Sequence, residues 1–141
     1  MSLTNLFGIA GSALNAQTVR MNATASNLAN AATTSGSEAS AFRAKRTVFK
    51  TIMEEQGAVQ MDRSKGGVKV QAVTDDPAPI TRLSEPGNPI ADKDGFVYRS
   101  NVNEMTEVVE MMAASRSYQN NVEVVNTARQ LMMRTLDIIK S

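Results

Sequence analysis

The sequence predicts an α+β fold, in which long helices at the two ends of the chain pack as an extended coiled coil and enclose a small β-rich middle module. Apolar residues near both ends recur at alternating spacings of three and four, which is the pattern of a coiled-coil contact. The middle third is instead rich in Gly, Pro and Asp. We therefore expect an N-terminal helix within residues 1–31, a middle module at 32–100 and a C-terminal helix within 101–141.

The N-terminal helix is expected to run from about Leu3 to Ala31. Ser2 is suited to cap its start, and Asn30 followed by Gly36 is suited to end it, because Asn and Gly tolerate the left-handed conformation. Its repeat also passes through Gln17 and Thr24. The apolar residues of the repeat, which we expect to form one half of an assembly seam, are Leu3, Phe7, Ala10, Leu14, Met21 and Leu28.

The C-terminal helix is expected to begin near Asn101 and to continue almost to Ser141. Asn101 and Glu104 have the spacing of a capping box, and Glu104 and Glu107 complement the positive end of the helix dipole. Its repeat also passes through Ser115 and Arg129. The other residues of the repeat, which form the second half of the expected assembly seam, are Val108, Met111, Tyr118, Val122, Val125, Met132, Leu136 and Ile139.

The length of this helix predicts an extended molecule. A helix from Glu104 to Ile139 is about 54 Å long at about 1.5 Å per residue, whereas a compact chain of this size has a radius of gyration of about 14 Å. Further apolar residues such as Met105, Val109 and Met112 widen the apolar stripe, and five of the nine methionines lie on this helix. The stripe indicates additional partners, although an ordinary Met-rich core is the alternative.

The middle module is predicted to contain short strands. Residues 68–72 alternate as a strand does, a turn at Asp75-Asp76-Pro77 follows, and residues 80–83 return as a second strand. The segment 85–89 is too rich in Pro and Gly for regular structure. Residues 92–95, of sequence Asp-Lys-Asp-Gly, predict a hairpin-type turn before a strand at 96–98.

Composition argues against most chemistry. The chain has no Cys and no His, which removes thiolate nucleophiles, imidazole bases and the usual zinc ligands. No catalytic constellation is recognisable, so we expect a protein that is not an enzyme and has neither a cofactor nor a small-molecule substrate. The Asp-Lys-Asp-Gly sequence at 92–95 lacks the later ligands of a calcium loop.

Charge makes nucleic acid an unexpected partner. Fifteen basic residues against fourteen acidic ones leave a net charge of +1, too little to attract a polyanion. The local basic run at residues 42–50 keeps a nucleic-acid patch open as an alternative. A basic strand that faces acidic neighbours such as Glu54 and Glu55, or an acidic subunit, explains the run equally well.

A Sec-type signal is not expected at the N-terminus. Residues 6–16 are largely apolar, but no Lys or Arg precedes Arg20, and polar residues interrupt the run. No stretch approaches the roughly 20 apolar residues that cross a bilayer. If the protein is exported, we therefore expect a route without a cleaved Sec signal.

Several motifs resemble those of flagellar axial proteins. The end of the N-terminal helix, Ser26, Asn27, Leu28, Ala29 and Asn30, is similar to the Asn-rich motif of that group. More specific are the sequences at 42–45, 66–70, 86–92 and 114–127, the last containing Ser115, Arg116 and Tyr118. In this order they resemble the FlgC family of proximal-rod proteins over nearly the whole chain, although the stretches 34–41 and 52–65 are longer than that family leads us to expect.

The resemblance implies a structural subunit of the bacterial flagellar basal-body proximal rod that polymerises with other axial proteins into the drive shaft for motility. The implied partners are other rod subunits, neighbouring basal-body proteins near the MS ring, and the flagellar type III export apparatus. The implied location is the rod in the periplasmic space. A soluble coiled-coil adaptor that binds one partner helix is the alternative, because the same repeats would serve it.

Overall fold

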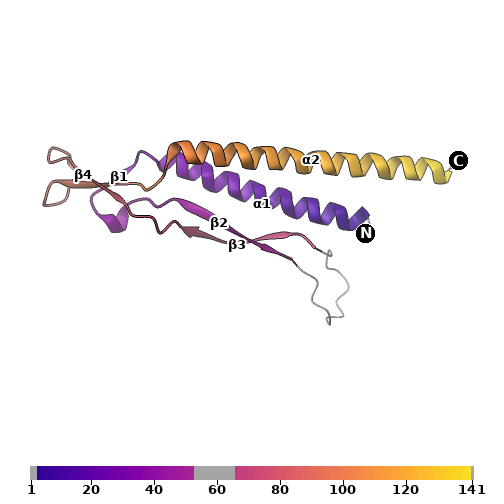
Figure 1. Ribbon diagram of the computed structural model, residues 1–141, viewed down its shortest axis with the longest axis horizontal. Coiled ribbons are helices and arrows are strands. Elements are labelled where there is room, and N and C mark those ends of the chain that lie inside the picture. The colour runs from indigo at the N-terminus through magenta and orange to yellow at the C-terminus, as the bar shows by residue number, and fades with distance from the viewer. Residues whose placement is uncertain (1–2, 53–65, 141) are drawn as a thin grey trace, which may run out of the picture.

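The molecule is elongated, with two helices and a β-hairpin lying lengthwise and a small sheet at one end (Figure 1). The computed structural model describes residues 3–52 and 66–140. Its elements in chain order are α1 (Leu3–Asn30), β1 (Thr34–Ser35), the 3₁₀ helix η1 (Glu38–Ser40), β2 (Lys45–Thr51), β3 (Val68–Asp75), β4 (Thr81–Ser84), β5 (Phe96–Arg99) and α2 (Glu104–Lys140). The predicted α+β class, with a helix at each end, is confirmed.

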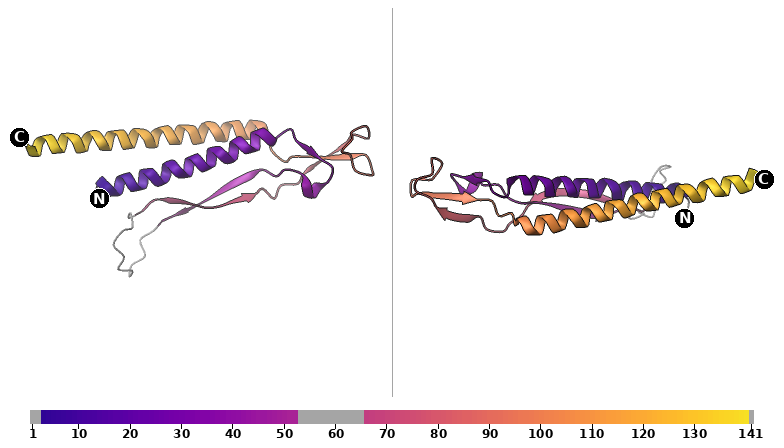
Figure 2. Two further views of the ribbon diagram at one scale, coloured as in Figure 1. Left: turned by 180° about the vertical axis from the view of Figure 1, so that it is seen from behind. Right: turned by 90° about the horizontal axis from the view of Figure 1, so that it is seen from above.

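Helix α1 lies between α2 on one side and the β2–β3 hairpin on the other (Figure 1). The two helices run antiparallel, and they span 28 and 37 residues. At about 1.5 Å per residue they are about 42 and 56 Å long. Helix α2 therefore continues beyond the N-terminal end of α1, as both views of Figure 2 show. The predicted extended shape is confirmed.

The strand pairing differs from the prediction. Residues 80–83 do not return onto 68–72; instead β3 pairs antiparallel with β2, from Lys45↔Asp75 to Thr51↔Val68, with an irregularity at Val48/Phe49. Strand β4 pairs with β5. The physical reason lies in the segment after β3, where Pro77 and Pro79 lack the N–H groups that a returning strand needs, so the chain leaves the hairpin.

The predicted turn before residues 96–98 is confirmed. The Gly95 N–H donates to the Asp92 carbonyl over 3.0 Å, and Gly95 has a φ of 78°, which favours glycine. Strand β5 then runs between β4 and the two-residue β1, giving the sheet order β1-β5-β4. Val97, in the centre of this sheet, is fully buried.

The start of α2 is capped by a different residue from the one predicted. The side-chain oxygen of Asn103 accepts from the Thr106 N–H over 3.1 Å, and its carbonyl accepts from the Glu107 N–H over 3.0 Å. Asn103 is therefore the N-cap, and the predicted capping role of Asn101 is wrong, because the Asn101 side chain is occupied elsewhere. The predicted cap of α1, Ser2, lies outside the described residues.

The buried apolar residues of the described part of the chain are mostly small. They are Ala10, Ala16, Ala31, Ala41, Ala44, Val97, Ala114 and Ala128. Small side chains let backbones approach closely, but they bury little apolar area. Within the described ranges the large apolar residues of α2 stay mostly at the surface, and no helix is long and apolar enough to cross a membrane.

Near the start of β3, the hairpin is hydrogen-bonded to α1 through Ser12. The Ser12 hydroxyl donates to the Ile9 carbonyl over 2.7 Å and accepts from the Val68 N–H over 3.1 Å. Gly67 has a φ of 139°, and a Cβ built on it would lie 2.8 Å from the Ser12 oxygen. Glycine at this position therefore permits both the backbone conformation and the close approach.

We predict that Gly67→Ala destabilises the docking of the hairpin on α1 by about 1–3 kcal/mol, because alanine is strained at this φ and its methyl group displaces Ser12. Urea unfolding with hydrogen exchange of the β3 amides measures the effect. Gly87→Ala is the matched control, since a Cβ there has no atom within 4 Å. Equal stability of the two variants would contradict the prediction.

Candidate assembly site

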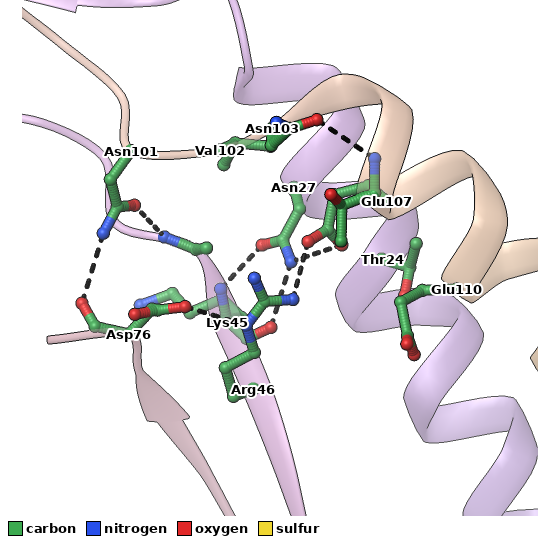
Figure 3. Close-up of polar contacts among 12 residues, drawn as sticks. Thr24, Asn27, Lys45, Arg46, Asp76, Asn101, Val102, Asn103, Glu107 and Glu110 are labelled. Atoms are coloured by element: carbon green, nitrogen blue, oxygen red, sulfur yellow. Dashed lines mark hydrogen bonds and ion pairs between the residues drawn. The ribbon is translucent and has the colours of Figure 1, made fainter. Parts of the chain in front are cut away.

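Helix α1 is joined to strand β2 by the side chain of Asn27. Its oxygen accepts from the Lys45 N–H over 2.7 Å, and its amide nitrogen donates to the Lys45 carbonyl over 3.0 Å (Figure 3). The side-chain amide thus pairs with both backbone groups of one residue, as a neighbouring strand would. Its nitrogen also donates to Oε2 of Glu107 over 2.9 Å, which brings α2 to the same point.

Glu107 is the centre of this junction. Its side chain is 1% exposed, yet it carries a carboxylate, whose burial is costly without partners. Arg46 supplies one, since its Nη1 lies 2.6 Å from Oε1 of Glu107, and Asn27 supplies the other. Arg46 also reaches Oδ2 of Asp76 with its Nε, over 3.0 Å. One guanidinium therefore links α2, β2 and the end of β3.

Asn101 holds the connection that leads into α2. Its side-chain oxygen accepts from the Ala44 N–H over 2.8 Å, while its nitrogen donates to the carbonyls of Asp76 and Ala78 over 3.2 and 3.0 Å. The Asp76 N–H donates to the Ala44 carbonyl over 2.8 Å. Together these bonds fix where α2 begins relative to the hairpin (Figure 3).

The charges at the junction support one another. The Ala78 N–H, and after it the Arg46 guanidinium, lower the pKa of Asp76 below its ordinary value. Burial by itself would lower the pKa of Arg46, but its hydrogen bonds to Asp76 and Glu107 outweigh that effect and raise it. Both groups are therefore charged at neutral pH, as the ion pair requires.

The basic run at 42–50 has acidic partners within the chain. Arg43 lies 3.4 Å from Glu38, Lys45 pairs with Asp75, and Arg46 pairs with Asp76 and Glu107. These partners agree with the interpretation of a basic strand facing acidic neighbours rather than a nucleic-acid patch. They are different from the acidic residues considered in the sequence, Glu54 and Glu55, which lie outside the described residues.

The predicted seam of α2 divides between two faces. Glu107, Ala114 and Ala128 are buried, and the half-buried seam residues between and after them are Met111, Tyr118, Val122, Val125 and Met132. The most buried series, 107, 114 and 128, lies one residue before the predicted positions 108, 115 and 129. Two predicted residues of this helix, Val108 and Leu136, are 44% and 46% exposed, and Ile139 is 74% exposed.

The predicted seam of α1 is more enclosed. Ala10 is buried, and Phe7, Leu14, Met21 and Leu28 are half-buried. The side chain of Leu3 lies outside the described part of the structure. Helix α1 has neighbours on two sides, the hairpin and α2, which accounts for the more even burial of its residues.

The motif residues have unequal environments. Asn27 is fully buried at the junction, and Leu28 is half-buried, whereas Ser26 and Ala29 are exposed. The Asn30 side chain donates to the Ser26 carbonyl over 2.8 Å within the last turn of α1. In the second motif, Ser115 and Tyr118 are half-buried and Arg116 is exposed.

Sequence reasoning missed the partners of Asn27. It assigned Glu107 only to the helix dipole, Arg46 to a basic strand and Asp76 to a turn. One feature of the sequence could have placed Glu107 on the inner face of α2. It lies seven residues before Ala114, on the face of the helix where small residues recur. No metal site was predicted, and the described residues contain no group of three or more potential ligands that could hold a metal ion.

Comparison with known proteins gives consistent matches at both ends of the chain and along its length. Residues 7–36 match the family described as flagella basal body rod protein, and residues 93–138 match the flagellar basal body rod FlgEFG protein C-terminal family. The chain is 49% identical over 138 residues to the flagellar basal-body rod protein FlgC of Yersinia enterocolitica, covering 98% of both chains. The chain belongs to the FlgC family of flagellar basal-body rod proteins.

Other FlgC proteins are similar over the same extent. That of Salmonella typhimurium is 46% identical over 138 residues, and that of Buchnera aphidicola from Acyrthosiphon pisum is 43% identical over 140 residues, each with 98% of both chains covered. As a member of the FlgC family, the chain is a structural subunit of the flagellar basal-body rod, as its motifs predicted.

We predict that Arg46→Met lowers the free energy of unfolding by about 3 kcal/mol, because it leaves the buried Glu107 carboxylate without its cation. Lys45→Met is the matched control on the neighbouring residue, since the pair of Lys45 with Asp75 is exposed and worth at most about 1 kcal/mol. Urea unfolding of both variants measures the difference. A smaller loss from Arg46→Met than from Lys45→Met would refute the central place of Arg46.

We also predict that the stabilising effect of Asp76 depends on pH. Because its pKa is lowered from 3.8 in the folded chain, its contribution is fully present above that pH and is lost as the pH falls through the folded value. The stability difference between the native chain and Asp76→Asn should therefore shrink below about pH 4. Urea midpoints from pH 7 to pH 2 measure it, and a constant difference across that range would contradict the prediction.

Proposed function

We propose that this rod subunit polymerises with other axial proteins into the proximal part of the rod, and that its helices close their open faces on neighbouring subunits. The observation that carries the proposal is the apolar surface of α2. Its exposed large apolar residues are Met105, Val108, Val109, Met112, Val124, Leu131, Met133, Leu136, Ile138 and Ile139. Exposed apolar surface on this scale is typical of a protein interface.

The packing of α1 on α2 is proposed to become a coiled coil within the rod. The inner face of α2 repeats at alternating spacings of four and three through Glu107, Met111, Ala114 and Tyr118, as a coiled-coil contact does. The predicted seam residues divide accordingly. Met111, Tyr118, Val125 and Met132 contribute to the contact inside the chain, and Val108 and Leu136 contribute to contacts with a neighbouring subunit.

Burial of those outer residues would supply stability that the single chain lacks. A leucine or isoleucine side chain contributes about 1.5–3 kcal/mol when it leaves water completely. The outer residues gain none of this while they are exposed in the free subunit, so the helix pair is expected to become more stable on assembly. The type III export apparatus is the proposed route before assembly, because a chain without disulfides can pass a narrow conduit unfolded.

The proposed location is the periplasmic part of the basal body, next to the MS ring. The middle module, residues 32–100, is short and lacks the large inserted domain expected of distal-rod and hook relatives, which supports a proximal place. The role is structural rather than catalytic. A soluble adaptor would use the same apolar face for one partner helix, and it would form a discrete complex that does not extend.

We predict that Leu136→Asp abolishes swimming in a strain that lacks the native gene, because an unpaired charge in a buried contact costs several kcal/mol. Val122→Asp is expected to act in the same way. The readouts are motility, the level of the variant in the cell, and basal bodies seen by electron microscopy. Rods should be missing although the variant is present.

Asn120→Asp is the matched control, since residue 120 is exposed and polar on the same helix. It should restore swimming as the intact chain does. Normal basal bodies in the strain without the gene would remove the proposed function and favour the adaptor. Normal swimming with Leu136→Asp would instead show that this residue stays outside any contact.

A further inference from the structure

One buried polar atom of the helix pair lacks a partner. Oε1 of Gln17, on α1, is enclosed, and it accepts no hydrogen bond within residues 3–52 and 66–140. A buried acceptor without a donor has lost its bonds to water and gained none in return, so such atoms are rare in folded proteins. An apolar residue at this position would avoid the cost, and the retained oxygen therefore calls for a donor.

Gln17 lies on the side of α1 that faces α2. It stands seven residues before the buried Thr24 and three residues before Arg20, and residues at these spacings share one side of a helix. The Arg20 side chain forms an ion pair with Glu110 of α2. The unpaired oxygen is therefore directed into the contact between the two helices.

Tyr118 brings a donor to the same contact from α2. It lies four residues after Ala114, which is fully buried, and it is itself half-buried. Its hydroxyl makes no hydrogen bond to any residue in the described part of the chain. A tyrosine hydroxyl at the surface can bond to water, but one that is buried usually has a protein partner. Tyr118 therefore needs an acceptor once a neighbouring subunit covers it.

The geometry of the helix pair directs these two side chains toward each other. Because the helices are antiparallel and Arg20 meets Glu110, Gln17 lies near the level of residue 113 of α2. Tyr118 is five residues farther along the axis, about 7.5 Å at about 1.5 Å per residue. Side chains on a helix lean toward its N-terminus, so in an antiparallel pair Gln17 and Tyr118 lean into the gap from opposite ends. Ala114, which lies between them, has only a methyl group.

We propose that the Tyr118 hydroxyl donates a hydrogen bond to Oε1 of Gln17 when the subunit is held in the rod, and that this bond is open in the free subunit. The inference rests on the proposed rod function. A neighbouring subunit that covers α2 removes the water that competes for the hydroxyl, and the lower local dielectric then strengthens the bond. The bond stiffens the middle of the helix pair only after assembly.

A double-mutant cycle with Gln17→Met and Tyr118→Phe tests the bond. Basal bodies are isolated from strains that carry each variant, or both substitutions together, as the only copy, and the rate at which urea releases this chain is measured. Each single substitution should raise the release rate about fivefold, as loss of one hydrogen bond does. The double variant should be released no faster than either single variant, because both substitutions remove the same bond.

The purified free subunit should behave differently. Tyr118→Phe should leave its urea midpoint unchanged, whereas Gln17→Met should raise the midpoint, because a buried unpaired oxygen is removed. The double variant should have the midpoint of Gln17→Met alone. A coupling in the free subunit as large as that in the rod would overturn the inference, since the bond would then exist before assembly.

Two other hydroxyl groups provide matched controls. Ser117 is the neighbouring hydroxyl on α2, and the hydroxyl of Tyr98 already donates to Asp92 over 3.1 Å, outside the helix pair. Ser117→Ala and Tyr98→Phe should each combine additively with Gln17→Met in the rod.

Additive effects of Gln17→Met and Tyr118→Phe in the rod would overturn the inference. Loss of rods with only one of these two variants would also overturn it, because the partners of one bond must act alike. Absence of the native chain from isolated basal bodies would instead remove the proposed rod function.

Discussion

The buried carboxylate of Glu107 is the constraint on which the rest of the arrangement depends. It lies at the first turns of α2, and its two partners come from the end of α1 and the start of β2. A buried charge is tolerated only while its partners remain in place, so these three segments must meet together. Asn27 and Asn101 add side-chain bonds to strand backbone, which fix the hairpin and the start of α2 at the same point.

This polar junction allows the remainder of the chain to be weakly packed. Away from it, Arg20 of α1 pairs with Glu110 of α2, and the fully buried apolar residues of the two helices are alanines, which contribute little apolar burial. Large apolar residues are left outside, and under the proposed function they gain their stabilisation from neighbouring subunits. The proposed subunit would then have a defined shape at one end and complete its helical contacts on assembly.

The helical repeats could be recognised from the sequence because a periodicity of three and four reports the face of a helix directly. The turn at 92–95 could also be predicted from the sequence, because Gly95 adopts a positive φ that other residues avoid. The strand that pairs with β3 could not be predicted from the sequence. Pairing between β2 and β3 depends on which segments meet in space, and the ion pair between Arg46 and Asp76 that borders it joins residues 30 positions apart.

The sequence by itself determined the class of the fold, the two long terminal helices, the extended shape and the family to which the chain belongs, because these follow from local periodicity and from motifs read in order. Only the tertiary structure decided that α2 turns Glu107, rather than Val108, toward α1, and that Asn103 rather than Asn101 caps it. The physical reason is that turning α2 about its axis by one residue position leaves its apolar pattern almost unchanged. The choice between the two faces is made by Arg46 and Asn27, which are distant in the sequence.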